Sequence, residues 1–186
     1  MPTINDANGT PANVTTRGMV KALAVSESLE GHTNRTHGQA FTWQFSTAAT
    51  AADDCIFYIK NTDDLPLILE GIDLFISDDC AIYLKLGGTG TTAAGTVVTG
   101  VAMNAGSGEV ADVTCLYAED VESGGTFTGA TECNRYSFES GTVVDTHNIN
   151  FPMDIVIPKN QVFSIWVDTA SVVIKGTLYG FFHNGV

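Results

Sequence analysis

Hydrophobic residues along the chain recur with the spacing of β-strands rather than of helices. In the segment 40–45 (AFTWQF), Phe41, Trp43 and Phe45 alternate with polar residues, so the three aromatic rings are expected on one face of a strand. No window repeats apolar residues at the i, i+3, i+4 and i+7 positions of an amphipathic helix for more than two turns. The pattern therefore predicts an all-β chain.

Short runs of β-branched and aromatic residues, separated by clusters of Gly, Asn, Asp and Ser, predict the remaining strands. They lie at 55–60, 65–76, 80–86, 97–103, 110–117, 143–149, 154–157, 163–167 and 172–182, with weaker, irregular strands around Phe127 and at 136–138. The run at 65–76 is long enough to bend, or to cross between sheets, near Gly71. Eight or more short strands favour an antiparallel β-sandwich or barrel.

Glycine-rich and polar segments separate these runs. The segment 87–96 (GGTGTTAAGT) is expected to form a flexible loop or hairpin tip, because a helix is not compatible with this composition. Turns are expected at 104–108 and 158–160, and an acidic loop at 119–125. Phe181, Phe182 and His183, near the end of the chain, are expected in the core, or alternatively at a subunit interface.

The chain divides near residue 37. Residues 1–37 are rich in Asn, Thr, Gly and Pro at their start and are expected to form an extended N-terminal arm with a possible first strand at 19–25; residues 38–186 form the sandwich domain. Three basic residues balance three acidic ones in the arm, namely Arg17, Lys21, Arg35, Asp6, Glu27 and Glu30. The whole formal charge of −13 therefore lies on the β domain.

This charge excludes several classes of partner. With 8 Lys and Arg against 21 Asp and Glu, the chain lacks the basic surface that nucleic acids and anionic membranes require. The first twenty residues show no secretory signal, and no apolar run is long enough to span a membrane. Neither nucleic acid nor a membrane is expected as a partner.

Four cysteines, Cys55, Cys80, Cys115 and Cys133, occur without a CxxC pair or a nearby histidine. This spacing argues against a zinc or redox site. They are expected to be free thiols that pack as small hydrophobic residues in a protein folded in a reducing cytoplasm.

Catalytic motifs are absent from the sequence, so no enzymatic activity and no cofactor are expected. His32 and His37 flank Arg35 in the polar segment GHTNRTHG, the only locally basic patch of the chain. The favoured interpretation is a solvated loop. Contact with an acidic partner, or metal binding across copies of a trimer, remain alternatives.

Adjacent aspartates occur at 53–54, 63–64 and 78–79, and a further acidic group contains Glu119, Asp120 and Glu122. Calcium prefers oxygen ligands from loops. Aspartate is also favoured in turns because it accepts hydrogen bonds from the nearby backbone. None of the pairs matches an EF-hand loop, and the turn interpretation is favoured, so no metal site is expected.

Three segments resemble a known family. They are VTGVAMNAGSGEVADVTCLYAED (98–120), which contains an N-x-G-S-G-x-x-A-type turn, YIKNTDDLPLILEGIDLFIS (58–77), with an Asn-Thr-Asp turn, and IPKNQVFSIWVDTASVVIKGTLYGFFHNG (157–185), with a Pro-Lys-Asn turn and a G-x-L-x-G-[FY] strand. These segments are similar to those of small jelly-roll decoration, or cement, proteins on the outside of tailed-bacteriophage heads.

The resemblance implies a sandwich of jelly-roll type and a noncatalytic virion protein. Such a protein assembles in the host cytoplasm, forms a homotrimer, binds the major capsid protein on the outside of the head and stabilises it. Because the resemblance does not cover residues 1–37, the arm could define the attachment. The candidate contacts with the capsid or a neighbouring subunit are Arg17, Lys21, His32, Arg35 and His37.

The alternative function is that of a carbohydrate-binding module or adhesin of a phage tail or cell surface. Sandwiches of this kind bind sugars on aromatic platforms, often near calcium. Trp43 and Trp166 are the candidate platforms. Trp43 alternates with Phe41 and Phe45 and is therefore expected in the core, whereas Trp166 could face either way.

Overall fold

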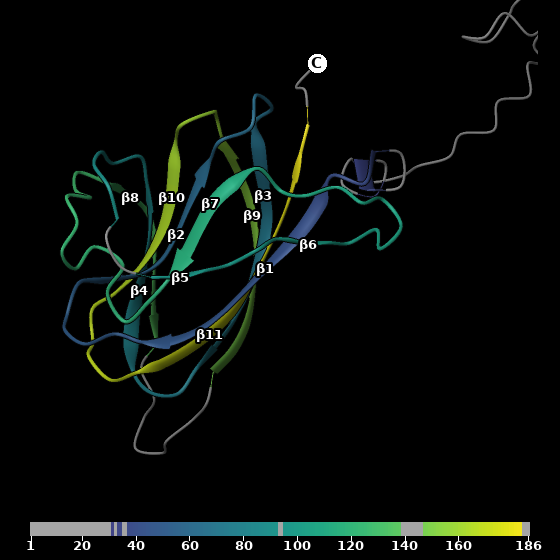
Figure 1. The fold of residues 1–186 in the computed structure, drawn as a ribbon. Coiled ribbons are helices and arrows are strands. Elements are labelled where there is room, and N and C mark those ends of the chain that lie inside the picture. The colour runs from purple at the N-terminus through teal and green to yellow at the C-terminus, as the bar shows by residue number, and fades with distance from the viewer. Residues whose placement is uncertain (1–30, 32, 35–36, 93–94, 139–146, 184–186) are drawn as a thin grey trace, which may run out of the picture.

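The computed structural model describes residues 31, 33–34, 37–92, 95–138 and 147–183, with the backbone alone at 147–151. These residues form two antiparallel sheets packed face to face (Figure 1). The predicted all-β sandwich is confirmed. The jelly-roll type stays a prediction, and the arm proposed for residues 1–37 lies almost entirely outside the described residues, including the strand expected at 19–25.

The strand order defines the two sheets. The first has the order β6 (Val101–Ala102), β1 (Ala40–Ala48), β11 (Val173–Phe182), β3 (Leu67–Ile76) and β9 (His147–Ile157). The second has the order β5 (Thr96–Val97), β7 (Val113–Tyr117), β2 (Asp54–Asn61), β10 (Val162–Val167), β4 (Cys80–Leu86) and β8 (Thr131–Phe138). Most expected strands are present, and the strand expected at 80–86 has the observed bounds.

Eight of these strands pair in a nested order. β1 pairs with β11, β2 with β10, β3 with β9 and β4 with β8, all antiparallel. The first strand thus meets the last and the second meets the one before the last, as in one long hairpin folded over on itself. A jelly roll would produce this order, with β5, β6 and β7 inserted between β4 and β8.

The strand expected at 97–103 is wrong as a single element. β5 ends at Val97 and belongs to the second sheet, whereas β6 begins at Val101 and belongs to the first. The intervening chain passes over Trp43, where a Cβ on Gly100 would stand 2.8 Å from the indole nitrogen. The close approach of the backbone to this ring uses the missing side chain of glycine and carries the chain from one sheet edge to the other.

Two other strands differ from expectation. The segments 143–149 and 154–157 were expected as separate strands, but β9 runs without a break from His147 to Ile157. Pro152 is tolerated because β9 is an outer strand of its sheet and the register shifts there, opposite Gly71. β3 is irregular at this point, as expected near Gly71, yet both halves stay in one sheet.

The core lies between the two sheets and contains the alternating residues that the pattern predicts. Phe41, Trp43 and Phe45 are all buried, and the Phe45 ring centroid lies 4.7 Å from that of Phe57 in the opposite sheet. Phe182 is also buried and meets Phe41 edge to face. The expected core position of the C-terminal aromatic pair is thereby confirmed.

A loop of the chain covers the outer face of the second sheet. Val121 and Phe127 from the loop 118–130 are buried against Tyr58 and Trp166. The Phe127 ring centroid lies 5.1 Å from that of Tyr58 and 6.3 Å from that of Trp166, and the Lys85 ammonium lies 3.7 Å from the centroid of the Trp166 ring. β2 and β10 are therefore buried on both faces, which explains why their sequences are continuously apolar.

Candidate interaction surface

Of the five predicted contact residues, His37 alone is described. Arg17, Lys21, His32 and Arg35 lie outside the described residues, and His37 is exposed. Gly31, Thr33, Asn34 and His37 are helical, so the loop expected for this segment is wrong at these positions. The helix ends at Gly38, whose φ of 68° allows its amide to donate to Asn34 O and Thr33 O at 3.0 and 3.1 Å.

The turn at 104–108 holds this short helix against the body. The side-chain amide of Asn104 donates to Asn34 O at 3.2 Å. Gly38 lies so close to Ser107 that a Cβ at residue 38 would overlap the serine side chain. The helical residues therefore lie beside the loop that follows β6 (Figure 1).

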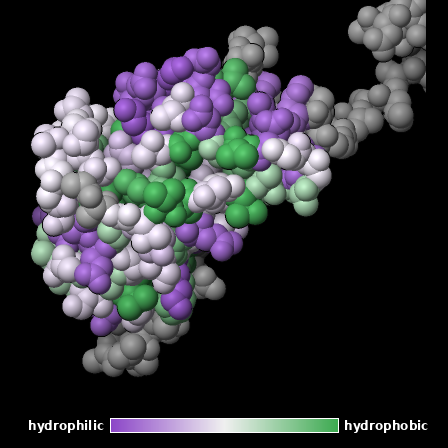
Figure 2. All heavy atoms as spheres, viewed as in Figure 1, coloured by the Kyte–Doolittle hydropathy of each residue, from purple (hydrophilic) through white to green (hydrophobic). Residues whose placement is uncertain are grey.

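The inserted segment between β4 and β7 carries an exposed apolar surface. No charged residue occurs between Lys85 and Glu109, although the chain has a net charge of −13. We call its exposed side chains, together with the neighbouring Val110, the apolar band: Val97 (73% exposed), Val101 (62%), Met103 (45%) and Val110 (73%). Figure 2 shows hydrophobic residues gathered over β5, β6 and β7. A cluster of this kind is typical of an interaction site.

Backbone bonds hold the apolar band to both sheets. Val98 N donates to Cys115 O, and Met103 N donates to Ala40 O, each at 2.9 Å. β5 and β6 are the last strands of their sheets among the described residues. Natural edge strands are protected by being very short, or by charges, proline or a covering segment. β5 and β6 carry neither charge nor proline, but each has only two residues.

A second candidate surface is a shallow groove of about 370 Å³ on the outer face of the first sheet. Its polar lining comes from neighbouring strands: Gln44 and Ser46 of β1, Asp73 of β3, and Lys175 and Thr177 of β11. Phe75 supplies an aromatic ring 5.6 Å from the Lys175 ammonium. Tyr179 donates to Asp73 Oδ2 at 2.6 Å, and this hydrogen bond raises the pKa of Tyr179.

Neither tryptophan is an exposed platform for a sugar. Trp43 has no exposed surface, as expected for a core position. Trp166 is buried beneath Lys85 and Phe127, and its indole nitrogen donates to Ser164 Oγ at 2.9 Å. The two residues proposed as sugar platforms are thus wrong for that role.

The paired aspartates stabilise turns, as the favoured interpretation expected. Asp54 accepts hydrogen bonds from Thr50 N at 2.9 Å and Ala51 N at 2.6 Å. Asp63 accepts from Leu65 N at 2.8 Å. In the acidic loop, Asp120 accepts from the amides of the second and third residues after it. Over the described part of the chain, no three His, Cys, Asp or Glu side chains are grouped to hold a metal ion.

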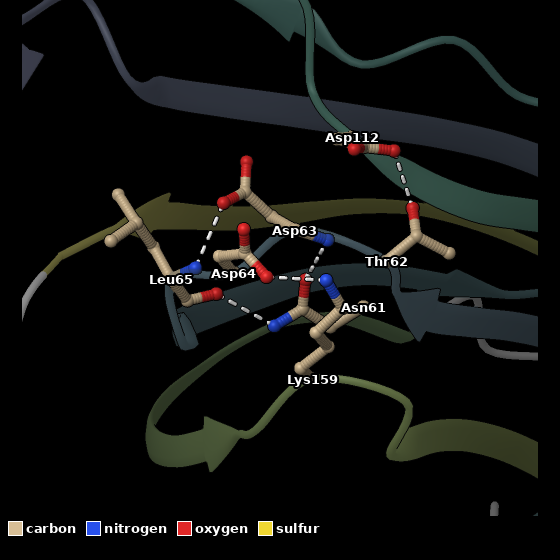
Figure 3. A network of polar contacts seen from close by, with 7 residues as sticks. All are labelled: Asn61, Thr62, Asp63, Asp64, Leu65, Asp112 and Lys159. Atoms are coloured by element: carbon tan, nitrogen blue, oxygen red, sulfur yellow. Dashed lines mark hydrogen bonds and ion pairs between the residues drawn. The ribbon is translucent and has the colours of Figure 1, made fainter.

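Two of the motifs that carry the family resemblance meet in one corner of the fold (Figure 3). Asn61 of the Asn-Thr-Asp turn is fully buried, and its Nδ2 donates to Leu65 O at 2.8 Å and to Ile157 O at 2.9 Å. Asn160 of the Pro-Lys-Asn turn donates its amide to Asn61 O at 2.8 Å. These motifs join the ends of β2 and β9 to the start of β3.

The same corner has an outer, charged layer. Lys159 forms an ion pair with Asp64, and Thr62 donates to Asp112. The Lys159 ammonium lowers the pKa of Asp64. Both Lys159 and Asp64 are well exposed, so the buried asparagine rather than the ion pair is expected to stabilise this corner.

The cysteines are free thiols, as expected. Burial raises the pKa of Cys55 and Cys115 far above the ordinary thiol value and that of Cys80 to about 12. These three thiols stay protonated at neutral pH and pack as hydrophobic residues. Cys133 is exposed, and partial burial of its sulfur still raises its pKa.

Comparison with known proteins gives no assignment. No family model matches the chain, and neither a curated protein nor a solved structure is significantly similar to it. No helix among the described residues is long and apolar enough to cross a membrane.

Sequence reasoning missed the apolar band. Val97, Val101 and Val110 fit strand patterns, and an exposed valine at the edge of a sheet has the same local sequence as a buried one. The available signal was the absence of charge between Lys85 and Glu109, which is unusual for a surface segment of an acidic protein.

Proposed function

We propose that this chain is a noncatalytic virion protein that decorates the outside of a tailed-phage head as a homotrimer and stabilises it. The observation that carries the proposal is the uncharged apolar band on an acidic domain, next to the turn at 104–108 that contacts Asn34. This arrangement suits a protein that works through contacts with other proteins.

The fold supports the proposal in two further ways. The nested pairing of eight strands is the order expected of a jelly roll. The motifs that resemble the decoration proteins also have structural rather than catalytic roles, as the hydrogen bonds of Asn61 illustrate. A resemblance carried by such residues favours a shared fold and a binding function.

The partner in this proposal is the major capsid protein. The neutral arm, with Arg17, Lys21, His32, Arg35 and His37, makes the contact, while the acidic domain faces solvent. Its charge suppresses nonspecific association with other acidic proteins.

The test is binding of the purified chain to heads assembled from the major capsid protein encoded with it. A variant lacking residues 1–16 should bind more weakly and give heads less resistance to heat. A variant with Lys159→Met, which changes an exposed residue of the remote corner, serves as the matched control. Equal affinity of the truncated and full-length chains would remove the arm from the interface, and no binding of the full-length chain would refute the proposal.

A carbohydrate-binding function is the second candidate, and the groove on the first sheet favours it. Asp73, Gln44 and Lys175 present hydrogen-bonding groups beside the ring of Phe75, a combination typical of sugar sites. Binding on a glycan array that is lost in Lys175→Ala and Phe75→Ala, but kept in Lys159→Met, would support it. An array without any bound glycan would exclude it.

A further inference from the structure

We propose that the groove on the outer face of the first sheet binds the interior of a neutral, linear polysaccharide, which lies across β1, β11 and β3 at right angles to the strands. The inference rests on the second candidate function, carbohydrate binding. It adds to that function the class of glycan, the direction in which the glycan lies and the part of it that is recognised.

The floor of the groove follows the register of the sheet. It contains three directly paired residues, Phe45 of β1, Gly176 of β11 and Leu74 of β3. Phe45 and Leu74 are buried in the core, and a Cβ on Gly176 would overlap the Phe45 ring on that same side. Because side chains alternate between the two faces of a sheet, these residues present backbone to the outer face.

Two rows of side chains flank this floor. The rows, each read from β1 through β11 to β3, are Gln44, Thr177 and Asp73 on one side and Ser46, Lys175 and Phe75 on the other. None of these six side chains is buried. Side chains two residues apart along a strand stand about 7 Å apart, so the two rows border a channel that crosses the strands.

The channel suits the interior of a chain better than its end. Its lining comes from β1, β3 and β11 alone, so among the described residues no loop closes it. On the β1 side, β6 pairs with residues 41–42 only and no strand lies beside Ser46. On the other side the register continues onto β9, with Asn150 opposite Asp73. Three strand spacings give a length of about 14 Å, along which several sugar units of one chain can lie.

A ligand on this face binds through side chains, because the backbone is already used. β11 pairs along its length with both β1 and β3, which leaves no free edge for a peptide strand. Asp73 offers an acceptor oriented by Tyr179, Lys175 offers a donor, and the amide and hydroxyls of the rows both donate and accept. Sugar hydroxyls do the same, and the ring of Phe75 provides an apolar surface beside them.

The charge of the domain favours a neutral glycan. Residues 38–186 carry the whole net charge of −13, and a polyanion is therefore repelled as it approaches. The lining contains one cation, Lys175, and one anion, Asp73, so the groove itself does not compensate this repulsion. A neutral polysaccharide has no such penalty.

The first experiment measures how far soluble polysaccharides retard the full-length chain in native gels. The neutral probes are β-glucan, xylan, mannan and galactan, and the charged probes are polygalacturonate and chitosan. We expect retardation by a neutral polymer, weakened about tenfold in Phe75→Ala because the apolar contact of one ring is lost. Lys175→Met and Lys159→Met form a matched pair, since each removes one exposed ammonium, and only the first should weaken binding. The urea midpoint of each variant verifies its folding.

The second experiment titrates the chain with oligosaccharides of the polymer that binds, from the monosaccharide to the hexasaccharide. Affinity that rises with length and then levels off, without binding of the monosaccharide, supports the inference. Equal affinity at all lengths indicates recognition of a chain end and overturns this inference while carbohydrate binding stands. Retardation by charged polymers alone, or binding that survives both Phe75→Ala and Lys175→Met, also overturns it. If no polymer is bound the inference is overturned, and the glycan array then decides separately whether the carbohydrate function stands.

Discussion

Replacement of the buried Asn61 by alanine tests whether the corner of Figure 3 stabilises the fold. The Asn61 side chain makes three hydrogen bonds, to Leu65 O, to Ile157 O and from Asp63 N. Ile157 is buried, so its carbonyl has no access to water after the substitution. The Leu65 carbonyl and the Asp63 amide are only partly buried, so they regain part of their hydration after the substitution.

The size of the effect follows from these three losses. A buried carbonyl without a partner costs about 1–3 kcal/mol, and each partly hydrated group costs about 0.5–1 kcal/mol. We therefore expect Asn61→Ala to lower the free energy of unfolding by about 2–5 kcal/mol. For a chain of this size such a loss corresponds to a fall in Tm of roughly 4–20 °C.

The assay is urea unfolding followed by tryptophan fluorescence, because Trp43 and Trp166 are both buried in the folded chain. Thr62→Val is the matched control, since it removes one exposed hydrogen bond to Asp112 from the neighbouring position. The midpoint should shift strongly for Asn61→Ala and slightly for Thr62→Val, with an unchanged slope. Equal shifts for the two variants would refute the assignment of the stability to the buried amide.

An aspartate at the same position sharpens the test. Asn61→Asp retains the acceptor for Asp63 N but places a buried carboxylate against two carbonyl oxygens, so its folded-state pKa is raised. A raised carboxyl pKa means that destabilisation is greatest at neutral pH and declines as the pH falls. A variant equally unstable at pH 7 and pH 4.5 would contradict this account.

Three further predictions concern other parts of the molecule. Gly176→Ala should lower the free energy of unfolding by about 1–3 kcal/mol, since a Cβ there would overlap the Phe45 ring. Adding Phe45→Leu to this variant should partly restore the midpoint of unfolding. A thiol reagent at neutral pH should label Cys133 alone in the folded chain and all four cysteines in urea; rapid labelling of Cys55 in the folded chain would disprove its burial. The Lys159 ammonium lowers the pKa of Asp64, so the ion pair favours folding above the ordinary carboxyl pKa, and this stabilisation is lost as the pH falls. In Lys159→Met, an NMR titration should show that the Asp64 pKa rises towards its ordinary value. An unchanged Asp64 pKa would exclude the ion pair in solution.

The period-two pattern was sufficient to predict the sandwich and most of its strands. Phe41, Trp43 and Phe45 alternate and are buried, because a strand with one face on the core has this pattern. The pattern could not show that β2 and β10 are buried on both faces, since the residues that cover them come from the distant loop 118–130. It also missed the helical conformation at Gly31, Thr33, Asn34 and His37, because the sequence there is polar and shows no apolar periodicity.

The candidate surface was less predictable than the fold. Local sequence cannot separate an exposed Val101 from a buried valine, because exposure depends on whether another strand lies alongside. The Asn-Thr-Asp and Pro-Lys-Asn turns were recognisable as motifs, but their contact depends on the pairing of β2 with β10 and of β3 with β9. Tertiary pairing of this kind is set by the whole chain.

The attachment of the short helix to β1 has a mechanical consequence. Gly38 leads almost directly into β1, whose nine residues pair with β11 from Ala40 opposite Phe181 to Ala48 opposite Val173. A pull on the arm along the strand loads these hydrogen bonds together, in shear, rather than opening them one after another. β11 is in turn paired along its length with β3, so the load spreads across the sheet. A partner that holds the arm therefore pulls on the middle of the domain rather than on a strand at its margin.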